Sequence, residues 1–401
     1  MKNIWPTKKL GEIREEVKLK KAPVGNLPYI EIGSVDVGGK KIAYGDKGAV
    51  GGSIFCPENS ILISRVRPTR GAVALIDKKM AVSSAFTIIK PKPEINTKLL
   101  FYFLAWNKKL FNYLGNKQKG TNYPSVKQSD ILDFEISFPK DKNVQRKIVY
   151  VLDSIQAAVG VQSELIEKTK ELKKSLLSEI FNSKIKSQKS KLQFKIQKWV
   201  EIGDENYFEI RLGGTPKTNV PNYWNGDICW ITPNDLGELN SQFITDTERK
   251  ITKEGLKAGS NLLPAGSIIL STRAPIGYLA ILDQDMAFNQ GCKGIIIKKF
   301  DEVFNLYLFY YLTTQVNKLK DWGSGSTFKE LSTSGLKQFS IPLVDIKKQR
   351  EIAQTLQTID QKIEVEQRKK VLYEELFRVI LNKLMTGEIK VDNLKYGFRG
   401  I

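Results

Sequence analysis

The sequence predicts an α+β protein in which two homologous globular domains are separated by two long helices that form an antiparallel coiled coil. One observation is a phrase that occurs twice, SILISRVRPTRGAVALID from Ser60 to Asp77 and SIILSTRAPIGYLAILD from Ser267 to Asp283, with a period of about 206 residues. A second is that the same long helical pattern follows each copy. A chain of 401 residues has room for two or three domains of ordinary size. We therefore expect a pseudo-twofold internal repeat.

The repeat continues beyond the opening phrase. The segment GTNYPSVKQSDILDFEI at 120–136 matches GSTFKELSTSGLKQFSI at 325–341, and VQRKI at 144–148 matches KQREI at 348–352. A period of half the chain indicates a duplication of one large unit and not a solenoid of many short ones.

Each copy begins with a segment of mixed character. Short β-like runs at 60–64, 72–76 and 267–270 alternate with glycine and proline turns, and helix-like stretches cover 99–114 and 304–319. This combination predicts a globular α+β domain in each half.

A long helix follows each domain. Apolar residues recur with the 4-3-4 spacing of a coiled-coil seam, and corresponding positions in the two halves lie 204 residues apart. The predicted seam consists of Ile148, Leu152, Ile155, Val159, Leu172, Leu176 and Ile180 in the first helix and Ile352, Leu356, Ile359, Ile363, Leu376, Ile380 and Leu384 in the second. Each helix would be about 57 Å long at 1.5 Å per residue, too long to be buried in one small domain. Two such helices would hold the domains apart at a fixed distance.

These patterns divide the chain into five parts. The stretch NSKIKSQKSKLQFKIQK from Asn182 to Lys198 is polar and basic, which is typical of a solvated linker, although a dedicated binding arm is an alternative. The predicted parts are the first domain at 1–144, the first helix at 145–183, the linker and second domain at 184–348, the second helix at 349–389 and a tail at 390–401.

The charge balance indicates a polyanionic partner. The sequence has 63 Lys and Arg against 43 Asp and Glu, giving a formal net charge of +20 and a pI near 9.5. Such a surface attracts nucleic acid, although a lysine-rich composition without a partner would look the same. No apolar run approaches the roughly 18 to 20 residues of a membrane span, and the first residues lack the apolar core of a secretion signal, so we expect a cytoplasmic protein with no membrane partner.

The residue types also argue against an enzyme. The sequence has no histidine, which removes the commonest general base and excludes Ser-His-Asp and Cys-His arrangements within this chain. Cys56, Cys229 and Cys292 are far apart and form no Cys-x-x-Cys motif, so buried thiols are expected in place of a disulfide framework or zinc site. No phosphate-binding G-x-x-x-x-G-K-[ST] loop occurs.

Two related basic domains on a rigid spacer suit DNA that carries two separated half-sites. Dimeric DNA readers fix their half-site separation in this way, near multiples of a helical turn of about 10 base pairs. Because the two domains differ in sequence, their half-sites should differ, and the target should be bipartite and asymmetric.

Several motifs of the second copy stand in a fixed order, namely LGGTPKTNVPNYWNGDICWITPNDL at 212–236, FNQGCKG at 288–294, GSTFKEL at 325–331, IPL at 341–343 and KQREIA at 348–353. With these motifs the sequence resembles a known family, the specificity (S) subunits of type I restriction-modification systems, and the resemblance covers both halves. In the first copy, VSSA at 82–85 stands where the second copy has FNQG at 288–291, so the identity of the first half-site is less defined by the resemblance.

The resemblance implies a non-catalytic subunit with two target-recognition domains that reads double-stranded DNA. It implies that the helices dock two methyltransferase (M) subunits and, through the larger complex, motor-nuclease (R) subunits. S-adenosylmethionine, ATP and magnesium would then be held by those partners, and this chain would hold no cofactor and no metal.

Candidate DNA-binding residues lie in two places in each copy. A one-residue slip in the repeated phrase aligns Arg67 with Arg273 just past a β-like run, where a guanidinium can fork to guanine or hold a phosphate, or merely pair with a carboxylate. The loops at 117–124 and 323–329 are rich in glycine, hydroxyls and lysine, and are either DNA contacts or ordinary turns with an aromatic anchor. The full set is Arg65, Arg67, Arg70, Lys119, Thr121, Asn122, Tyr123, Lys217, Arg273, Ser326, Thr327 and Lys329.

Two other classes of protein are alternatives to a specificity subunit. A fused methyltransferase-nuclease would need a cofactor-binding domain and an Asn-Pro-Pro-aromatic motif, and the sequence has neither. A coiled-coil structural protein whose basic domains bind DNA without sequence preference remains as the alternative, and its complexes would be removed equally by any duplex.

Overall fold

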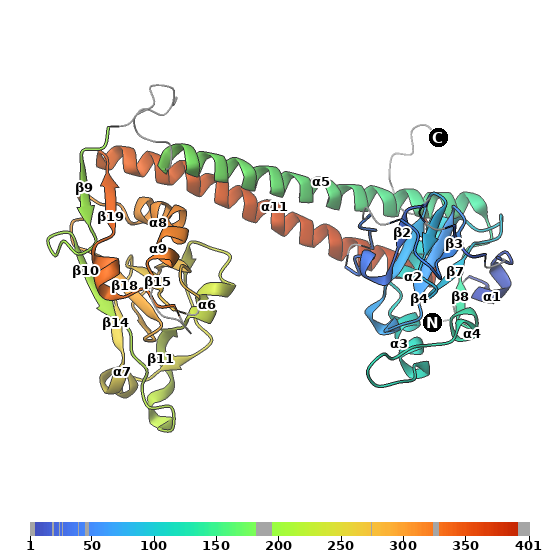
Figure 1. Ribbon diagram of the computed structural model, residues 1–401, viewed down its shortest axis with the longest axis horizontal. Coiled ribbons are helices and arrows are strands. Elements are labelled where there is room, and N and C mark those ends of the chain that lie inside the picture. Colours follow the sequence, from blue (N-terminus) through green and yellow to red (C-terminus); the bar gives the residue numbers. More distant parts are fainter. Residues whose placement is uncertain are drawn as a thin grey trace. The chain divides into compact units, whose positions relative to one another are not determined.

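The computed structural model describes residues 5–17, 20–23, 25, 27–38, 40–44, 48–181, 195–273, 275–323 and 329–391. The chain forms two compact units. Unit 1 comprises Met1–Glu164 with Gln367–Ile401, and unit 2 comprises Leu165–Glu366. Each unit thus holds one globular domain, the first part of the long helix that follows it, and the last part of the other long helix (Figure 1). The division runs through the helices, whereas the sequence-based boundaries lie at helix ends.

The globular part of unit 1 contains three small sheets with strand orders β5-β4-β7, β2-β6-β3 and β1-β8. Its strands are β1 (Thr7–Lys9), β2 (Tyr29–Ile30), β3 (Ile54–Cys56), β4 (Ser60–Ser64), β5 (Val73–Ile76), β6 (Met80–Val82), β7 (Phe86–Ile89) and β8 (Glu135–Ser137). Its helices are α1 (Leu10–Ile13), α2 (Thr97–Ala105), α3 (Lys108–Lys117) and α4 (Gln128–Leu132), followed by the long helix α5 (Lys142–Phe181).

Unit 2 contains sheets with strand orders β10-β18-β15-β16-β12, β13-β11-β17-β14 and β19-β9. Its strands are β9 (Lys198–Glu201), β10 (Phe208–Leu212), β11 (Trp224–Ile231), β12 (Phe243–Ile244), β13 (Lys250–Ile251), β14 (Asn261–Leu263), β15 (Ile268–Ser271), β16 (Leu279–Leu282), β17 (Met286–Phe288), β18 (Cys292–Ile297) and β19 (Ser340–Leu343). Its helices are α6 (Pro233–Glu238), α7 (Lys253–Gly259), α8 (Asn305–Thr314), α9 (Val316–Asp321) and α10 (Thr333–Lys337), followed by α11 (Ile346–Thr386).

The two units repeat one topology, which confirms the predicted duplication. The antiparallel set β5-β4-β7 corresponds to β16-β15-β18, and β2-β6-β3 corresponds to β11-β17-β14. The corresponding pairs β2 with β6 and β11 with β17 are both parallel, and unit 2 has a further parallel pair, β12 with β16. The additional strands of unit 2 extend these sheets at their edges.

The two stretches predicted as single helices, 99–114 and 304–319, are each broken into two. In unit 1 the break falls at Asn107, whose side chain is buried and accepts a hydrogen bond from the Leu110 backbone N–H at 3.1 Å. This side chain caps α3, because an Asn at this position satisfies an N–H that has no partner in the first turn. In unit 2 the break falls at Gln315, between α8 and α9.

The start of each long helix is anchored by a buried glutamine. Gln145 accepts from the Asn96 N–H at 2.7 Å and donates to the carbonyls of Glu94 and Pro139. Gln349 does the same in unit 2, accepting from the Phe304 N–H at 2.9 Å and donating to two carbonyls at 2.8 Å. The repeated Gln-Arg dipeptide therefore marks a joint between helix and domain.

The long helices are 40 and 41 residues long, close to the predicted length. In unit 2 Lys173 of α5 forms an ion pair with Asp360 of α11. Further along α5, Ile180 shares a core with Leu356, which lies earlier in α11, so the two segments run in opposite directions. In unit 1 the start of α5 and the end of α11 share a core in the same way. The antiparallel pairing is as predicted.

The predicted seam is right for the first half of each helix and partly wrong for the second. Ile148, Leu152, Ile155, Ile352 and Leu356 are buried, but they pack into the domain cores as well as facing the other helix. Val159, Leu176, Ile359, Ile363 and Ile380 are half-buried, and Ile180 and Leu384 are buried.

Leu172 and Leu376 were wrongly placed in the seam, because they are 53% and 40% exposed. The buried residue in place of Leu376 is its neighbour Phe377, whose ring lies 4.9 Å from that of Trp106. The apolar face shifts by one residue because the helix end packs against the aromatic side chains of α2.

Residues 182–194 of the predicted linker lie outside the described residues. Its last residue, Lys198, begins β9, and its ammonium contacts the Tyr207 hydroxyl and the Glu302 carboxylate. That end of the segment is therefore part of the fold of unit 2. Within the described residues, no helix has the length and apolar character needed to cross a membrane.

Candidate nucleic-acid interface

In unit 1 the structure brings the predicted arginine and the predicted loop together at the end of β4. Val66 forms a β-bridge with Ser125, and the Arg67 N–H donates to the Pro124 carbonyl at 2.7 Å. The guanidinium of Arg67 lies 5.2 Å from the ring centroid of Tyr123. Tyr123 is 73% exposed, so it does not anchor the loop in the core. A stacked, outward-facing arginine is suited to a DNA contact.

The other loop candidates in unit 1 surround this pair. Lys119 and Ser125 exchange two backbone hydrogen bonds of 2.9 Å, which closes the loop. Lys119, Thr121 and Asn122 are exposed on it, and Arg70 is exposed at the end of the short 3-10 helix Pro68–Arg70. The predicted residues of unit 1, apart from Arg65, therefore lie on this loop or in the turn after β4.

Arg65 differs from its neighbours, since its side chain turns into the domain. Its Nη2 donates to the Ser84 carbonyl, and its Nε is buried without a partner among the described residues. Its own carbonyl accepts from the Val126 N–H at 2.9 Å. The structure thus gives Arg65 a role in holding two segments together.

The backbone ladder corrects the predicted equivalence of Arg67 and Arg273. In unit 2 the Leu331 N–H donates to the Thr272 carbonyl at 2.9 Å, and Arg273 forms a β-bridge with Glu330. These contacts match those of Arg65 and Val66 in unit 1. Arg273 therefore occupies the place of Val66, and the extra residue of the first copy falls in the turn that contains Arg67. A turn accommodates an insertion that the paired strand cannot.

Arg273 is also differently partnered. Its Nη1 lies 4.0 Å from Glu330 Oε2, and the other oxygen of Glu330 lies 3.6 Å from Lys293 Nζ. Of the two roles predicted for this arginine, a DNA contact or an ion pair with a carboxylate, Arg273 has the ion pair in this structure. In unit 1 the residue that corresponds to Glu330 is Ser125, which has no charge.

Lys293 is a buried cation that the sequence analysis missed. Its ammonium donates to the Thr272 hydroxyl at 3.2 Å and to the Leu331 carbonyl at 2.8 Å. Burial lowers the pKa of Lys293, although Glu330 opposes this shift. A lysine within the apolar run CKGIII of β18 was the one available signal.

In unit 1 the two residue types are exchanged, because Arg65 stands at the position of Thr272 and Thr87 stands at the position of Lys293. Both pairs are diagonal neighbours on adjacent antiparallel strands, Thr272 with Lys293 and Arg65 with Thr87. Each domain thus places one cation and one threonine at this point, but on opposite strands. We call this point the cation locus.

The remaining candidates are in unit 2. Lys217 is exposed, and its carbonyl accepts from Trp224 Nε1 at 3.2 Å. Lys329 is exposed next to Glu330. Ser326 and Thr327 lie outside the described residues.

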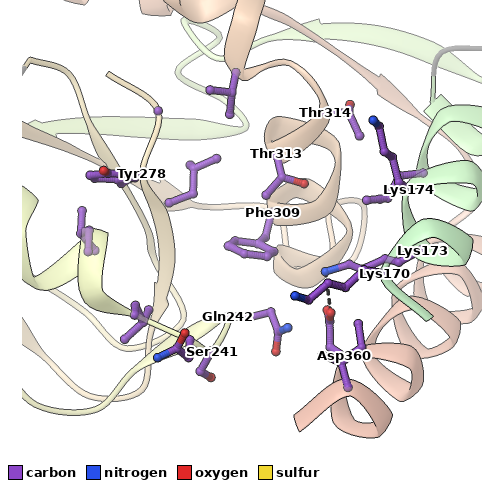
Figure 2. A pocket seen from close by; sticks show the side chains of 18 of the residues that line it. Lys170, Lys173, Lys174, Ser241, Gln242, Tyr278, Phe309, Thr313, Thr314 and Asp360 are labelled. Carbon is purple, nitrogen blue, oxygen red and sulfur yellow. Dashed lines mark ion pairs between the residues drawn. The ribbon is translucent and has the colours of Figure 1, made fainter. Parts of the chain in front are cut away.

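A cavity of 810 Å³ lies in unit 2 between α5, α8 and the segment after α6 (Figure 2). Lys170, Lys173 and Lys174 line one wall, and Phe309 and Tyr278 line others. Lys173 is paired with Asp360 at 2.5 Å, and Asp360 also accepts from the Tyr310 hydroxyl at 2.8 Å. The carboxylate of Asp360 is therefore held by structural partners.

The structure also characterises the groups that metal and redox chemistry would use. Cys56, Cys229 and Cys292 are buried free thiols, as predicted, and burial raises the pKa of Cys56 and of Cys292 to about 12. Among the described residues, no group of three or more His, Cys, Asp or Glu is placed to hold a metal ion.

Comparison with known proteins gives consistent matches. The family model described as the type I restriction modification DNA specificity domain matches residues 4–193 and 196–373. The MjaIX specificity subunit of Methanocaldococcus jannaschii is 40% identical over 171 residues, which are 42% of this chain and 39% of that relative. The putative MjaX specificity subunit of the same organism is 26% identical over 94% of this chain and 86% of its own length.

Solved structures share the fold. A chain from a structure of the type I restriction-modification system, titled for its complex assembly and conformational transition, has a TM-score of 0.65 at 20% identity and covers 96% of this chain and 98% of its own. The S subunit from M. genitalium has a TM-score of 0.58 at 18% identity, covering 96% of both chains.

Proposed function

Because the chain belongs to the family of type I restriction-modification DNA specificity proteins, we propose that it is the DNA-recognition subunit of such a system. Each globular domain binds one half of a bipartite, asymmetric DNA site. The single observation that carries this proposal is that both domains use one framework with different side chains at the same edge. Arg67 stacks on Tyr123 in one, whereas Arg273 faces Glu330 in the other.

The difference between the two edges supports different half-sites. An arginine without a carboxylate partner presents all its donors to phosphate or guanine. One held near a carboxylate presents fewer donors, and the carboxylate itself accepts from the amino group of cytosine. Two domains with these two edges would therefore prefer different base pairs.

The partners are proposed from the helices. We infer that α5 and α11 dock two methyltransferase subunits and, through the whole complex, motor-nuclease subunits. Polar side chains near the helix starts, such as Arg146 and Arg350, and the exposed apolar residues of α11, such as Leu372 and Leu376, supply the surface. The apolar residues lie at i and i+4, the spacing at which a further helix packs.

The chain itself is proposed to be non-catalytic. S-adenosylmethionine, ATP and magnesium would be held by the partner subunits, where adenine methylation and DNA cleavage take place. The thiols with raised pKa and the carboxylates tied up in ion pairs support this division of labour.

The proposal is tested by mapping methylated adenines in the native genome with and without this gene. We expect one bipartite motif to lose methylation when the gene is deleted and to regain it when the gene is restored. An unchanged methylome in cells that express the partner subunits would refute the proposal.

The alternative, DNA binding without sequence preference, gives a different result in competition. A complex on the mapped motif should survive an excess of random duplex, because specific affinity typically exceeds non-specific affinity by about 10³ or more. Equal displacement by random and motif-bearing duplexes would favour the alternative.

A further inference from the structure

We propose that Lys217 and Arg249, gathered around the indole of Trp224 in unit 2, form a clamp for a DNA backbone phosphate. This site, the Trp224 clamp, is separate from the edge that carries Arg273. The inference rests on the proposed function, because it assigns a further contact to the second DNA-binding domain.

The clamp is built on two perpendicular indoles. Trp224 and Trp230 lie at opposite ends of β11, with ring centroids 5.1 Å apart and an interplanar angle of 86°. The guanidinium carbon of Arg249 lies 3.8 Å from the Trp224 centroid and 5.2 Å from that of Trp230. Arg249 therefore rests on one ring face and touches the second, which orients the plane of its guanidinium.

Both indole rings are held in place by burial and by hydrogen bonds. Trp224 is 9% exposed and Trp230 is 3% exposed. Trp224 Nε1 donates to the Lys217 carbonyl at 3.2 Å, and Trp230 Nε1 donates to the Gly214 carbonyl at 3.0 Å. The same indole thus carries the Arg249 guanidinium on its face and holds the backbone of Lys217 through its N–H.

The backbone of Arg249 is fixed as well. Its carbonyl accepts from the Trp230 N–H at 3.1 Å and from the Thr247 hydroxyl at 2.7 Å. Stacking and these bonds reduce the freedom that the side chain would lose on binding a ligand. Preorganisation of this kind raises affinity without adding contacts.

The charges of the clamp are not neutralised within the described part of the chain. Arg249 and Lys217 are exposed, and neither makes an ion pair there, whereas the next residue, Lys250, is paired with Asp246 at 3.0 Å. A planar guanidinium offers two parallel N–H donors, which suit one phosphate group. The exposed Lys217, whose backbone is bonded to the same indole, adds a positive charge to this part of the surface.

The clamp is connected to the edge that carries Arg273. The loop after β17 contacts both, since the Gln290 side chain meets the Thr215 hydroxyl and the Gly291 carbonyl accepts from the Thr272 N–H at 2.8 Å. A duplex bound at one site is therefore near the other, with the clamp holding the backbone while the edge meets the bases.

The test measures DNA affinity of the full chain in complex with its methyltransferase subunits, over a series of salt concentrations. Two duplexes are used, one with the mapped bipartite motif and one random. Arg249→Ala and Lys217→Ala should each weaken binding to both duplexes by the same factor, roughly 10-fold, and each should reduce the salt slope by about 1. Arg249→Lys should restore part of the affinity.

Lys298→Ala is the matched control. It removes one exposed positive charge from the same domain. Lys298 follows the end of the β10–β18 pair that holds Phe208 and Ile297, whereas the clamp is reached from the other end, at Leu212. Its affinity and salt slope should equal those of the unmutated chain. Thermal unfolding of all variants checks that each remains folded, and only small shifts are expected, because Arg249→Ala loses its ring contacts and Lys298→Ala loses one hydrogen bond to the Glu205 carbonyl.

Two results would overturn the clamp. If Arg249→Ala changes neither affinity nor slope, the residue does not contact DNA. If it relaxes base preference in one half-site with an unchanged slope, it reads a base and not a phosphate. Failure of the proposed function is distinguishable, because the unmutated chain would then bind the two duplexes equally.

Discussion

At the scale of single residues, the two units show which side chains the fold itself requires. Gln145 and Gln349 make the same three hydrogen bonds in both units and are almost fully buried. The repeat in the sequence marked this position without explaining it. Its explanation needs the fold, because the carbonyls that accept from the amide lie in segments that sequence spacing does not connect.

Glu302 is a residue whose ionisation should tune stability. Its carboxylate contacts Lys198, Lys299 at 3.0 Å and the Tyr207 hydroxyl at 2.8 Å. The hydrogen bond from Lys198, followed by those from Lys299 and Tyr207, lowers the pKa of Glu302 to about 2 from the ordinary value of 4.5. A carboxyl whose pKa falls on folding stabilises the folded state above pH 4.5, and this contribution disappears as the pH falls towards 2.

We therefore expect the free energy of unfolding of Glu302→Gln to lie below that of the unmutated chain at neutral pH. The difference should be constant down to about pH 4.5 and shrink towards zero near pH 2. Urea unfolding at a series of pH values measures it. If the free energies of unfolding of the two proteins differed by the same amount at every pH, that result would contradict the role of this carboxylate.

At the scale of elements, the long helices keep their repeat pattern over most of their length and depart from it near their ends. The pattern predicted their existence, length and antiparallel pairing. It failed at Leu172 and Leu376, which are exposed. Aromatic side chains hold both helix ends, because Phe181 packs against Tyr307 and Tyr311 of α8, and Phe377 packs against Tyr102 of α2 and against Trp106, the residue after α2.

The shift of the buried face predicts losses of stability of very different size at two adjacent residues. Phe377→Ala should lower the free energy of unfolding by about 3–5 kcal/mol, because it removes a buried ring. Leu376→Ala, the matched control, should cost less than about 1 kcal/mol, since that side chain is 40% exposed. Denaturant midpoints of both variants distinguish the two faces, and a larger loss for Leu376→Ala would restore the seam predicted from spacing.

At the scale of the whole molecule, duplication made the sequence informative. Two divergent copies that share a spacing must share a fold, so each copy supported the assignment of the other. The candidate DNA-binding sites were less predictable. The contact between Trp224 and Arg249 joins residues 25 positions apart in a single copy, and neither composition nor periodicity singles them out.

Each long helix runs from one unit into the other, which predicts how helix length relates to the DNA target. Four residues inserted at equivalent points of α5 and α11 add about one turn, or about 6 Å, to each. We expect the methylated motif to keep both half-sites and to gain unread base pairs between them. Mapping of methylated adenines in cells carrying this variant measures the spacing. An altered half-site with an unchanged number of unread base pairs would show that the helices do not set the spacing between the half-sites.

The cation locus has a consequence for exchanging parts between the two halves. A chimera that takes β4 from unit 1 and β18 from unit 2 would bring the positive charges of Arg65 and Lys293 to one point. The reciprocal chimera would place Thr272 next to Thr87, with no cation between the two strands. We therefore expect chimeras that exchange a whole domain to fold, and chimeras joined between these two strands to be destabilised.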